Sequence, residues 1–342
     1  MLRSTTINRK RTAAAVSGVL LLGVTACGAE SGGGGGGGGT TLVMGHQLAA
    51  DTPFDKGLDR FAELVEKKTD GSVTVEVHPN AEIGSEKELF QGMQDGTVDG
   101  GVIAPGSIAE FVPEVSVLSM PFLVTSREQR DQIIEGPVAE EITTMIDEQT
   151  GVRTVGYFGG GIRNMFFTEP VSGPQDIQGR LFRTQPSEML TDAFGAVGLE
   201  PTVVAYNELY NALQQGVVDG AENESVYIVS QKFYEPAPHI LRTQHEVTIR
   251  PLMMSGQTLD NLPDDQRQAV LDAAEEASSY ERELEGETDD AALKRLTEEL
   301  GATVTEADTA AMAEKVRPVW MKYAKQWDMV DAVEQMAELQ TS

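Results

Sequence analysis

The sequence predicts an α/β protein with two lobes around a central ligand cleft. Strand-like apolar runs alternate with amphipathic helical runs along most of the chain, which favours mostly parallel sheets covered by helices. Residues 88–101 (ELFQGMQDGTVDGG) recur in register as residues 208–221 (ELYNALQQGVVDGA). The repeat allows two interpretations: two unrelated helix–Gly–strand turns, or two similar lobes whose strand ends face one cleft.

Length and composition suit one large or two medium domains with a sizeable core. The chain has 342 residues, of which 40% are hydrophobic, and a formal net charge of −28. A surface this acidic repels nucleic acids and anionic membranes and favours solubility. We therefore expect no nucleic-acid partner, and an anionic ligand would need arginines gathered at its site.

The N-terminal residues predict a lipoprotein signal peptide over residues 1–26. Three basic residues, Arg9 to Arg11, precede the apolar run 12–24, which is too short to span a bilayer. The run ends in Val-Thr-Ala-Cys, which resembles the lipobox of bacterial lipoproteins and implies cleavage before Cys27 and lipid attachment to its sulfur. The alternative is an ordinary signal peptide with an incidental cysteine.

A tether is expected between the anchor and the folded part. Residues 27–40 comprise Cys27 and a glycine-rich stretch with eight consecutive glycines, 32–39. This composition is typical of flexible linkers. Because Cys27 is the only cysteine, the chain can form neither an internal disulfide nor a cysteine metal cluster.

The first half of the chain shows strands that end in polar residues. A short apolar strand over 42–44 is followed by His46 and Gln47, and a helix begins after Thr52. Ser107 follows another predicted strand, so these three polar side chains are candidates for the cleft. The other elements expected here are strand 73–77, helix 85–94, strand 101–104, helical residues 127–148 with a break near Gly136, and strand 152–158.

The central stretch, residues 179–223, reads strand, helix, strand, helix, strand. Arg183 lies at the end of a short strand, and a helix capped by Asn207 ends at Gly216. The next strand starts at Val217 and ends at Asn223. Ligands bind outside the carboxyl ends of strands in open α/β sheets, so Arg183 and Asn223 are expected to face one cleft.

A second arginine follows a glycine run. Residues 159–161 are three glycines, and Arg163 comes two positions later. A guanidinium offers a planar fork of donors that matches a carboxylate. The alternative for Arg163 and Arg183 is a structural salt bridge, since the chain has 54 acidic residues.

The C-terminal part is expected to be mainly helical. A strand-like run over 244–251 contains His245 and Arg250. The elements that follow are a long helix from Pro263 to about Gly286, a helix over 288–300, a strand over 302–305 and a helix over 309–326.

Catalytic motifs are missing from the sequence. The four histidines show no metal-ligand spacing, and there is neither a Gly-x-Ser-x-Gly elbow nor a phosphate-binding loop. We expect no metal, no cofactor and no catalysis. An enzyme acting on acidic sugars would need His46 or His245 as its general base.

Several motifs together resemble the substrate-binding proteins of tripartite ATP-independent periplasmic (TRAP) transporters, the DctP family. The resemblance covers nearly all of residues 41–340. The motifs are Lys67–Gly71 (KKTDG), Ile83–Glu86 (IGSE), Gly161–Asn164 (GIRN), Gly179–Arg183 (GRLFR), Glu208–Gly220 (ELYNALQQGVVDG) and Glu222-Asn223.

This resemblance implies a two-lobed, class II-like periplasmic-binding-protein fold with crossing strands, a long connecting helix and a central ligand cleft. The first lobe would comprise residues 41–160 with about 250–287. The second would comprise residues 161–249 with about 288–342.

The resemblance also implies roles for particular residues. Arg183, in the strand after the Asp176–Gly179 loop, would clamp a substrate carboxylate, and Arg163 would assist. Asn223 would be the cleft asparagine, and Tyr206 the cleft aromatic. Ala221 and Glu224 depart from the residues usual around this Glu-Asn pair. His46, Gln47 and Ser107 would contact the polar remainder of the ligand.

The expected function is capture of an organic acid and its delivery to a TRAP permease. A sugar acid such as a uronate is favoured, because the Asp-Gly-Ala-Glu-Asn and Gly-Ile-Arg-Asn runs resemble family members that bind sugar acids. A C4-dicarboxylate is the alternative, with Arg163 or Arg250 holding the second carboxylate. A monomer held at the membrane only by its lipid is expected. Less favoured alternatives are a surface enzyme and a sensory lipoprotein.

Overall fold

The computed structural model describes residues 39–340. The predicted signal peptide, Cys27 and all but the end of the glycine-rich tether lie outside these residues. The first strand begins at Thr40. No helix among the described residues is long and apolar enough to cross a bilayer.

The first sheet has five strands in the order β2-β1-β3-β10-β4. Strand β1 pairs in parallel with β2 and β3, and β10 pairs antiparallel with β3 and β4. Their bounds are β1 Thr40–Gly45, β2 Val73–His78, β3 Gly100–Val102, β4 Val152–Phe158 and β10 Arg250–Ser255.

The second sheet has six strands in the order β11-β9-β5-β8-β6-β7. The pairs β6–β7, β6–β8 and β9–β11 are parallel, whereas β5 is antiparallel to both β8 and β9. The bounds are β5 Ile162–Phe167, β6 Leu181–Thr184, β7 Glu200–Val203, β8 Gly220–Glu224, β9 His239–Val247 and β11 Thr303–Glu306. Both sheets are therefore mixed: among residues 39–340, five strand pairs are parallel, as the alternation of elements predicts, and four are antiparallel.

Antiparallel pairs arise because the chain crosses between the sheets without a helix. Strand β4 of the first sheet continues through the glycines 159–161 into β5 of the second. Strand β9 of the second sheet continues into β10 of the first, so the run expected over 244–251 is two strands. Each crossing sends a strand into its new sheet against the direction of its neighbours.

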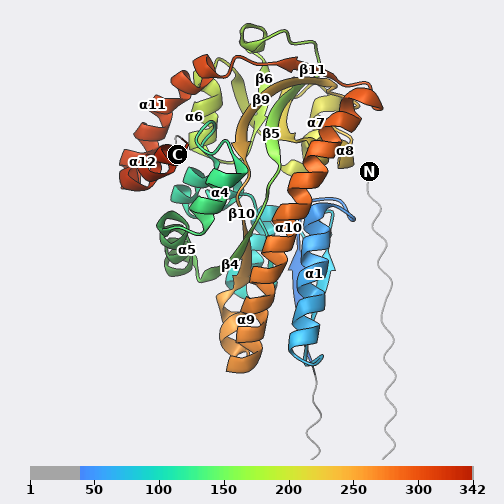
Figure 1. The fold of residues 1–342 in the computed structure, drawn as a ribbon, viewed down its shortest axis with the longest axis vertical. Coiled ribbons are helices and arrows are strands. Elements are labelled where there is room, and N and C mark those ends of the chain that lie inside the picture. Colours follow the sequence, from blue (N-terminus) through green and yellow to red (C-terminus); the bar gives the residue numbers. More distant parts are fainter. Residues whose placement is uncertain (1–38, 341–342) are drawn as a thin grey trace, which may run out of the picture. The chain divides into compact units, whose positions relative to one another are not determined.

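Helix α10 makes a third crossing. It runs without a break from Asp264 to Glu298 along both halves of the molecule (Figure 1). The two helices expected here, separated near Gly286, are therefore one. Gly286 stays helical, and the site where its Cβ would stand is 3.2 Å from Nε of Arg127. A glycine thus lets the Arg127 guanidinium lie against the helix.

Helices cover the sheets on their outer faces (Figure 1). Helix α1 packs against α10, and α11 packs against α6. The predicted break near Gly136 is confirmed, since α4 ends before it and α5 begins after it. The helices are α1 Pro53–Lys68, α2 Glu86–Asp95, α3 Pro105–Ile108, α4 Arg127–Ile134, α5 Pro137–Thr150, α6 Glu188–Ala196, α7 Leu209–Gln214, α8 Ser225–Ser230, α9 Gly256–Asn261, α10, α11 Ala310–Gln326 and α12 Val330–Glu338.

The sequence repeat is a structural repeat. Helices α2 and α7 end near glycines with the same left-handed backbone, Gly96 and Gly216, both at φ 71°. Asp99 then accepts a hydrogen bond from the Val43 amide of β1 at 2.8 Å, and Asp219 accepts one from the Leu181 amide of β6 at 3.0 Å. In each sheet the aspartate ties the strand after the helix to its parallel neighbour.

The second repeat differs from expectation at both ends of its helix. A 3₁₀ turn over Tyr206–Glu208 precedes α7, so Asn207 lies within that turn and does not cap a helix. Val217 is 49% exposed, and the strand begins only at Gly220.

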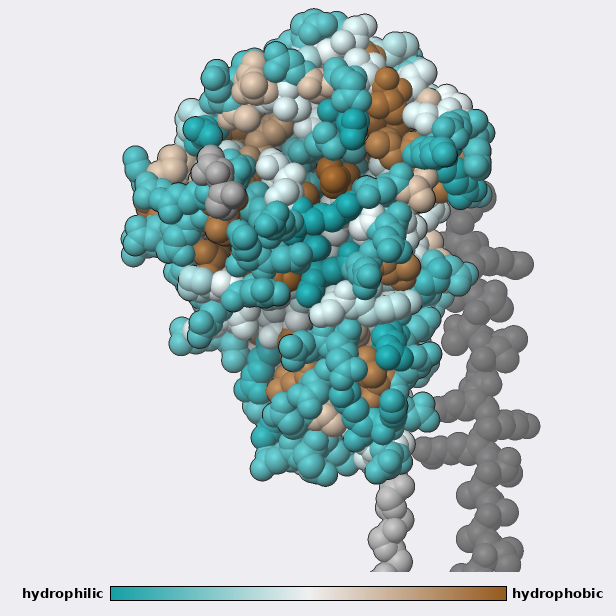
Figure 2. All heavy atoms as spheres, in the orientation of Figure 1, coloured by the Kyte–Doolittle hydropathy of each residue, from teal (hydrophilic) through white to brown (hydrophobic). Residues whose placement is uncertain are grey.

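The surface agrees with the acidic composition. The face shown in Figure 2 is mostly hydrophilic, with hydrophobic residues in scattered small areas. The apolar residues gather instead in the buried clusters between the sheets and their helices.

Candidate functional site

A cavity lies between the two sheets, and residues of both sheets line it. It continues outward into a groove, with which it shares Gln47, Glu86, Arg183 and Tyr206. The cavity residues are Gln47, Leu48, Phe54, Glu86, Val102, Ala104, Arg163, Arg183, Gln185, Tyr206 and Arg250.

Arg183 lies in β6 and is only 3% exposed. Its Nε donates to the Val204 carbonyl at 3.0 Å, and its guanidinium lies 5.7 Å from the ring centroid of Tyr206. No carboxylate among residues 39–340 forms an ion pair with it. Burial lowers the pKa of Arg183 from its ordinary value, as expected for a cation without a counterion.

Arg163 also lines the cavity, but two carboxylates occupy its guanidinium. The antiparallel register sets Arg163 of β5 opposite Glu224 of β8, whose Oε2 lies 2.7 Å from Nη1. Its Nε is bonded to Glu222, and Nη2 donates to the Glu222 carbonyl at 3.1 Å. The predicted alternative for Arg163, a structural salt bridge, is therefore present.

The pKa of Glu222 is affected by its pairing with Arg163. Burial alone would raise it, but Arg163 and His245 hold it well below its usual range. His245 is fully buried, with Nε2 3.5 Å from Glu222 and Nδ1 2.7 Å from the Thr243 hydroxyl. Its own pKa is lowered by burial. His245 therefore belongs to the ion-pair network and does not line the cavity.

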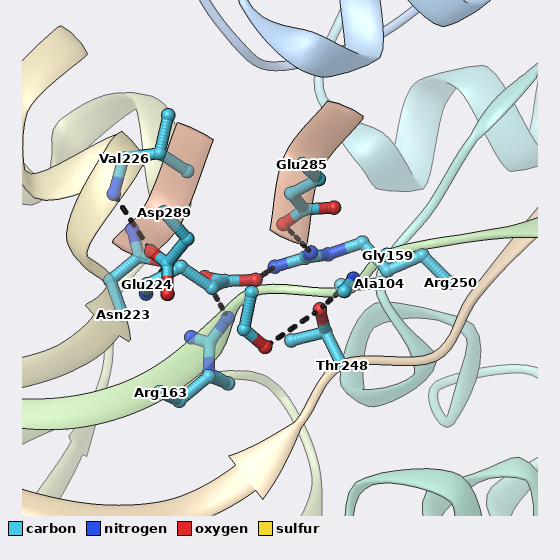
Figure 3. Close-up of polar contacts among 12 residues, drawn as sticks. Ala104, Gly159, Arg163, Asn223, Glu224, Val226, Thr248, Arg250, Glu285 and Asp289 are labelled. Atoms are coloured by element: carbon cyan, nitrogen blue, oxygen red, sulfur yellow. Dashed lines mark hydrogen bonds and ion pairs between the residues drawn. The ribbon is translucent and has the colours of Figure 1, made fainter. Parts of the chain in front are cut away.

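Arg250 is the third arginine of the cavity and is also paired. It bonds Glu224, and its Nη1 lies 3.8 Å from Glu285 of α10, as Figure 3 shows. Its guanidinium lies 5.0 Å from the ring centroid of Phe54 and 5.7 Å from that of Tyr227. Burial opposes the charge, but Glu224 and Glu285 raise the pKa of Arg250.

Carboxyl groups on one face of α10 surround the crossing segments. Asp289 accepts hydrogen bonds from the Ile162 and Val226 amides, each at 3.0 Å (Figure 3). Glu281 accepts one from the Gly159 amide at 2.8 Å. Burial raises the pKa of Asp289 to about 6 and that of Glu281 to about 7, and raises that of Glu285 well above its usual value.

These pairings set the charge of the cavity. Glu222 and Glu224 balance Arg163 and Arg250, whereas burial favours the neutral form of Glu285. Arg183 is left as a buried cation whose two terminal nitrogens have no hydrogen-bond partner within the described part of the chain. The site can therefore hold one anionic group through a bidentate fork.

Two of the predicted site residues stand behind the cavity wall. The Asn223 amide donates to the Tyr206 hydroxyl at 2.9 Å, and its oxygen accepts from the Glu224 amide at 3.0 Å. His46 is 1% exposed, with Nε2 3.2 Å from Asp55 and Nδ1 accepting from the Leu48 amide at 3.2 Å. The structure does not bring Asn223 or His46 to the cavity, and His46 positions the loop that carries Gln47.

The other predicted residues reach the cavity or its groove. Gln47 lines both, and its amide donates to the Gly84 carbonyl at 2.9 Å. Ser107 lines the groove and donates to Glu86. Tyr206 lines both, and burial raises the pKa of its hydroxyl above the ordinary value. Among residues 39–340, no group of three or more histidine, cysteine and acidic residues could hold a metal ion.

Two polar residues of the cavity, Glu86 and Gln185, were not predicted from the sequence. Glu86 follows Gly84 and Ser85 in a motif assigned to the family resemblance, so it was available as a candidate. Gln185 comes two residues after Arg183, at the end of β6, and its Oε1 is buried without a hydrogen-bond partner. The signal for Gln185 was its place just beyond a strand end, and the signal for Glu86 was its place at the start of a helix within that motif.

Known proteins share this architecture. Residues 44–326 match the family model described as bacterial extracellular solute-binding protein, family 7. A TRAP periplasmic solute-binding protein from Sulfitobacter sp. NAS-14.1, solved with bound α-D-taluronate, is 35% identical. The alignment covers 88% of this chain and 98% of that one, with a TM-score of 0.84.

Two further relatives bind different acids. A TRAP periplasmic solute-binding protein from Roseobacter denitrificans OCh 114, solved with bound L-galactonate, is 31% identical over 86% of this chain and 98% of that one, with a TM-score of 0.81. The C4-dicarboxylate-binding periplasmic protein DctP of Rhodobacter capsulatus is 30% identical over 87% of this chain and 91% of its own length. The two-lobed periplasmic-binding-protein fold is thus confirmed, and the chain belongs to family 7 of the bacterial extracellular solute-binding proteins.

Proposed function

We propose that this protein binds a sugar acid with a single carboxylate and delivers it to a TRAP permease. The observation that carries the proposal is Arg183: a buried cation in the cavity whose terminal nitrogens are unpaired. Arg183 holds the ligand carboxylate, and Tyr206 packs beside the guanidinium. Gln47 and Ser107 bond the hydroxyl groups, whereas Arg163 and Asn223 hold the cavity wall in place.

The charges of the cavity favour one carboxylate over two. A C4-dicarboxylate would need a second cation, and Arg163 and Arg250 were the candidates. Both are already neutralised by Glu222 and Glu224. A polyhydroxylated acid suits the remaining polar groups better, and relatives with bound taluronate or galactonate support this class.

Binding closes the two lobes on the ligand, since residues of both sheets line the cavity. We assign residues 41–160 with about 250–287 to the first lobe and residues 161–249 with about 288–342 to the second. The crossings at 159–161 and 248–249 and helix α10 are the segments that bend. The protein acts as a monomer without a cofactor or a catalytic step.

The protein works outside the cytoplasm, as its family does, and we propose that a lipid on Cys27 holds it at the membrane. Cleavage of residues 1–26 would make Cys27 the N-terminal residue. Residues 27–40 would then be a tether between the membrane and the two lobes. Replacing Cys27 with serine should release the protein from the membrane fraction. Retention of that variant would contradict the anchor and leave the binding function untouched.

Thermal unfolding of residues 41–342 with a panel of acids tests the binding function. A ligand present at 100 times its dissociation constant stabilises the folded state by about 2.7 kcal/mol. We expect a rise in melting temperature with uronates or aldonates and none with succinate or malate. A rise only with dicarboxylates would replace the sugar acid by the alternative ligand class, and no rise with any carboxylate would overturn the proposal.

A further inference from the structure

Glu86 and Arg183 line the same cavity from different elements, Glu86 from helix α2 and Arg183 from strand β6. Glu86 is the first residue of α2, after the Ser85 cap, and lines both the cavity and the groove. No cation among the described residues forms an ion pair with it, whereas its neighbour Lys87 pairs with Glu110 at 3.0 Å. Glu86 and Arg183 thus line the same cavity as an acid and a cation, and neither forms an ion pair among the described residues.

The Glu86 carboxylate is held in one orientation. Oε1 accepts from the Ala104 amide at 3.0 Å, and Oε2 accepts from the Ser107 hydroxyl at 2.5 Å. A carboxylate offers about four acceptor positions, so two remain. These two positions can accept hydrogen bonds from a ligand hydroxyl, whereas the negative charge of Glu86 would repel a second carboxylate.

Gln185 supplies another acceptor from the second lobe. Its Oε1 is buried and unpartnered. A Cβ on Gly106 of α3 would stand 2.6 Å from this oxygen, so the glycine makes room for the Gln185 side chain. Apart from Arg183, the polar groups around the cavity therefore include acceptors from both lobes, which hydroxyl groups would satisfy.

We propose that Glu86 determines specificity, accepting a hydroxyl of the bound acid and excluding ligands with a second carboxylate. Gln185 accepts a further hydroxyl across the cavity. This inference rests on the proposed function and deepens it, since it assigns the choice between sugar acids and dicarboxylates to one side chain. The ligand would lie with its carboxylate on Arg183 and its hydroxyl end toward Glu86.

L-Galactonate and galactarate test the inference. They share a six-carbon polyhydroxylated chain and differ at one end, where galactarate has a carboxylate in place of CH₂OH. Calorimetry on the folded protein should show that the wild type binds galactonate about 100-fold more tightly, or more. In Glu86→Gln the galactonate affinity should fall up to about tenfold and the galactarate affinity should rise, so that the ratio drops about tenfold or more.

Glu188→Gln is the matched control. Glu188 is also the first residue of a helix after a serine cap, but it is exposed and lines no part of the cavity or groove. This variant removes the same charge and should leave the ratio unchanged. Glu86→Asp keeps the charge and should keep the ratio within about threefold. Melting temperatures of the unliganded variants verify that each is folded.

The outcomes separate this inference from the function on which it rests. A ratio that does not change in Glu86→Gln, with galactonate still bound by the wild type, overturns the role of Glu86 and leaves the sugar-acid function intact. If the wild type binds galactarate as tightly as galactonate, the role of Glu86 is likewise overturned and the sugar-acid function is left intact. A wild type that binds neither these acids nor a uronate overturns the proposed function itself.

Discussion

Arg183 and Arg250 lie in one cavity, both almost fully buried, and they differ in what surrounds them. Arg250 contacts Glu224 and Glu285 and lies over two aromatic rings. Arg183 contacts the Val204 carbonyl, through a hydrogen bond, and the ring of Tyr206. A buried cation with its counterions is compensated within the folded chain, and removing it would leave their charge buried, whereas a buried cation without counterions is an unfilled position for an anion. The comparison separates the arginine that maintains the cavity from the one that binds.

The largest expected effect is on folding. Arg250→Met leaves Arg163 as the only cation paired with Glu222 and Glu224, so one buried negative charge is uncompensated, and the change should cost about 3–5 kcal/mol of unfolding free energy. Urea denaturation measures it. Adding Glu224→Gln to Arg250→Met should recover part of the loss, because the uncompensated charge is gone. Equal stability of Arg250→Met and the wild type would show that the pair does not stabilise the fold.

Arg183→Met should show the reverse: weak binding with a nearly unchanged fold. Removing a buried charged clamp costs about 2–5 kcal/mol, which is about 30-fold or more in affinity. Arg183→Lys keeps the positive charge but loses the two-pronged donor geometry of the guanidinium. Its ligand affinity should therefore lie between those of Arg183→Met and the wild type. Titration calorimetry gives the affinities, and denaturation of the unliganded proteins gives their stability. Arg183→Met with wild-type affinity would remove Arg183 from the site.

The same contrast holds for buried acids and predicts a pH dependence of stability. Glu222 has a cation partner and a low pKa, whereas burial raises the pKa of Asp289 from 3.8 to about 6. Because the folded state binds this proton more tightly than the unfolded chain, the stabilisation is present below about pH 4 and is lost as the pH rises to about 6. At about 1.4 kcal/mol per pKa unit, the loss is on the order of 3 kcal/mol.

Asp289→Asn checks that prediction. The amide cannot ionise, so the decline in unfolding free energy between about pH 4 and 6 should be smaller than in the wild type. Asp290→Asn is a suitable control, since the neighbouring carboxylate pairs with Arg127 near the surface and its pKa is lowered. Identical pH profiles for Asp289→Asn and the wild type would exclude Asp289 as the source of the decline.

Local rules accounted for much of the fold. The Ser85 side chain and Glu88 form a capping box at the start of α2, and Gly96 closes that helix in the left-handed conformation. The left-handed glycine recurs as Gly216 after α7, although the capping box does not, and this shared helix end is part of why the sequence repeat is also a structural repeat. Where tertiary packing outweighed local preference, the prediction was wrong: Gly286 does not end α10, and its missing side chain leaves space for Arg127 against the helix.

The candidate site was also predicted only in part, because local sequence rules do not give the tertiary partners of a side chain. Strand ends point to a cleft, and that rule identified Gln47, Ser107 and Arg183. It also selected His46, whose ring nitrogens are taken up by Asp55 and the Leu48 amide. A residue's position at a strand end determines where its backbone lies. The hydrogen-bond partners of its side chain determine whether that side chain reaches the cavity.

By itself, the sequence determined the alternation of elements, the helix ends, the acidic surface and the residues available for a carboxylate clamp, since each depends on neighbours within a few positions. The local pattern alone left Arg163 and Arg183 as equal candidates, and the family resemblance favoured Arg183 without giving a physical reason. Only the tertiary structure separated them, because the antiparallel pairing of β5 with β8 sets Arg163 beside Glu222 and Glu224, about 60 residues away in the chain. Parallel pairing of β6 with β8 gives Arg183 no such partner, so strand direction decided which arginine is free to bind.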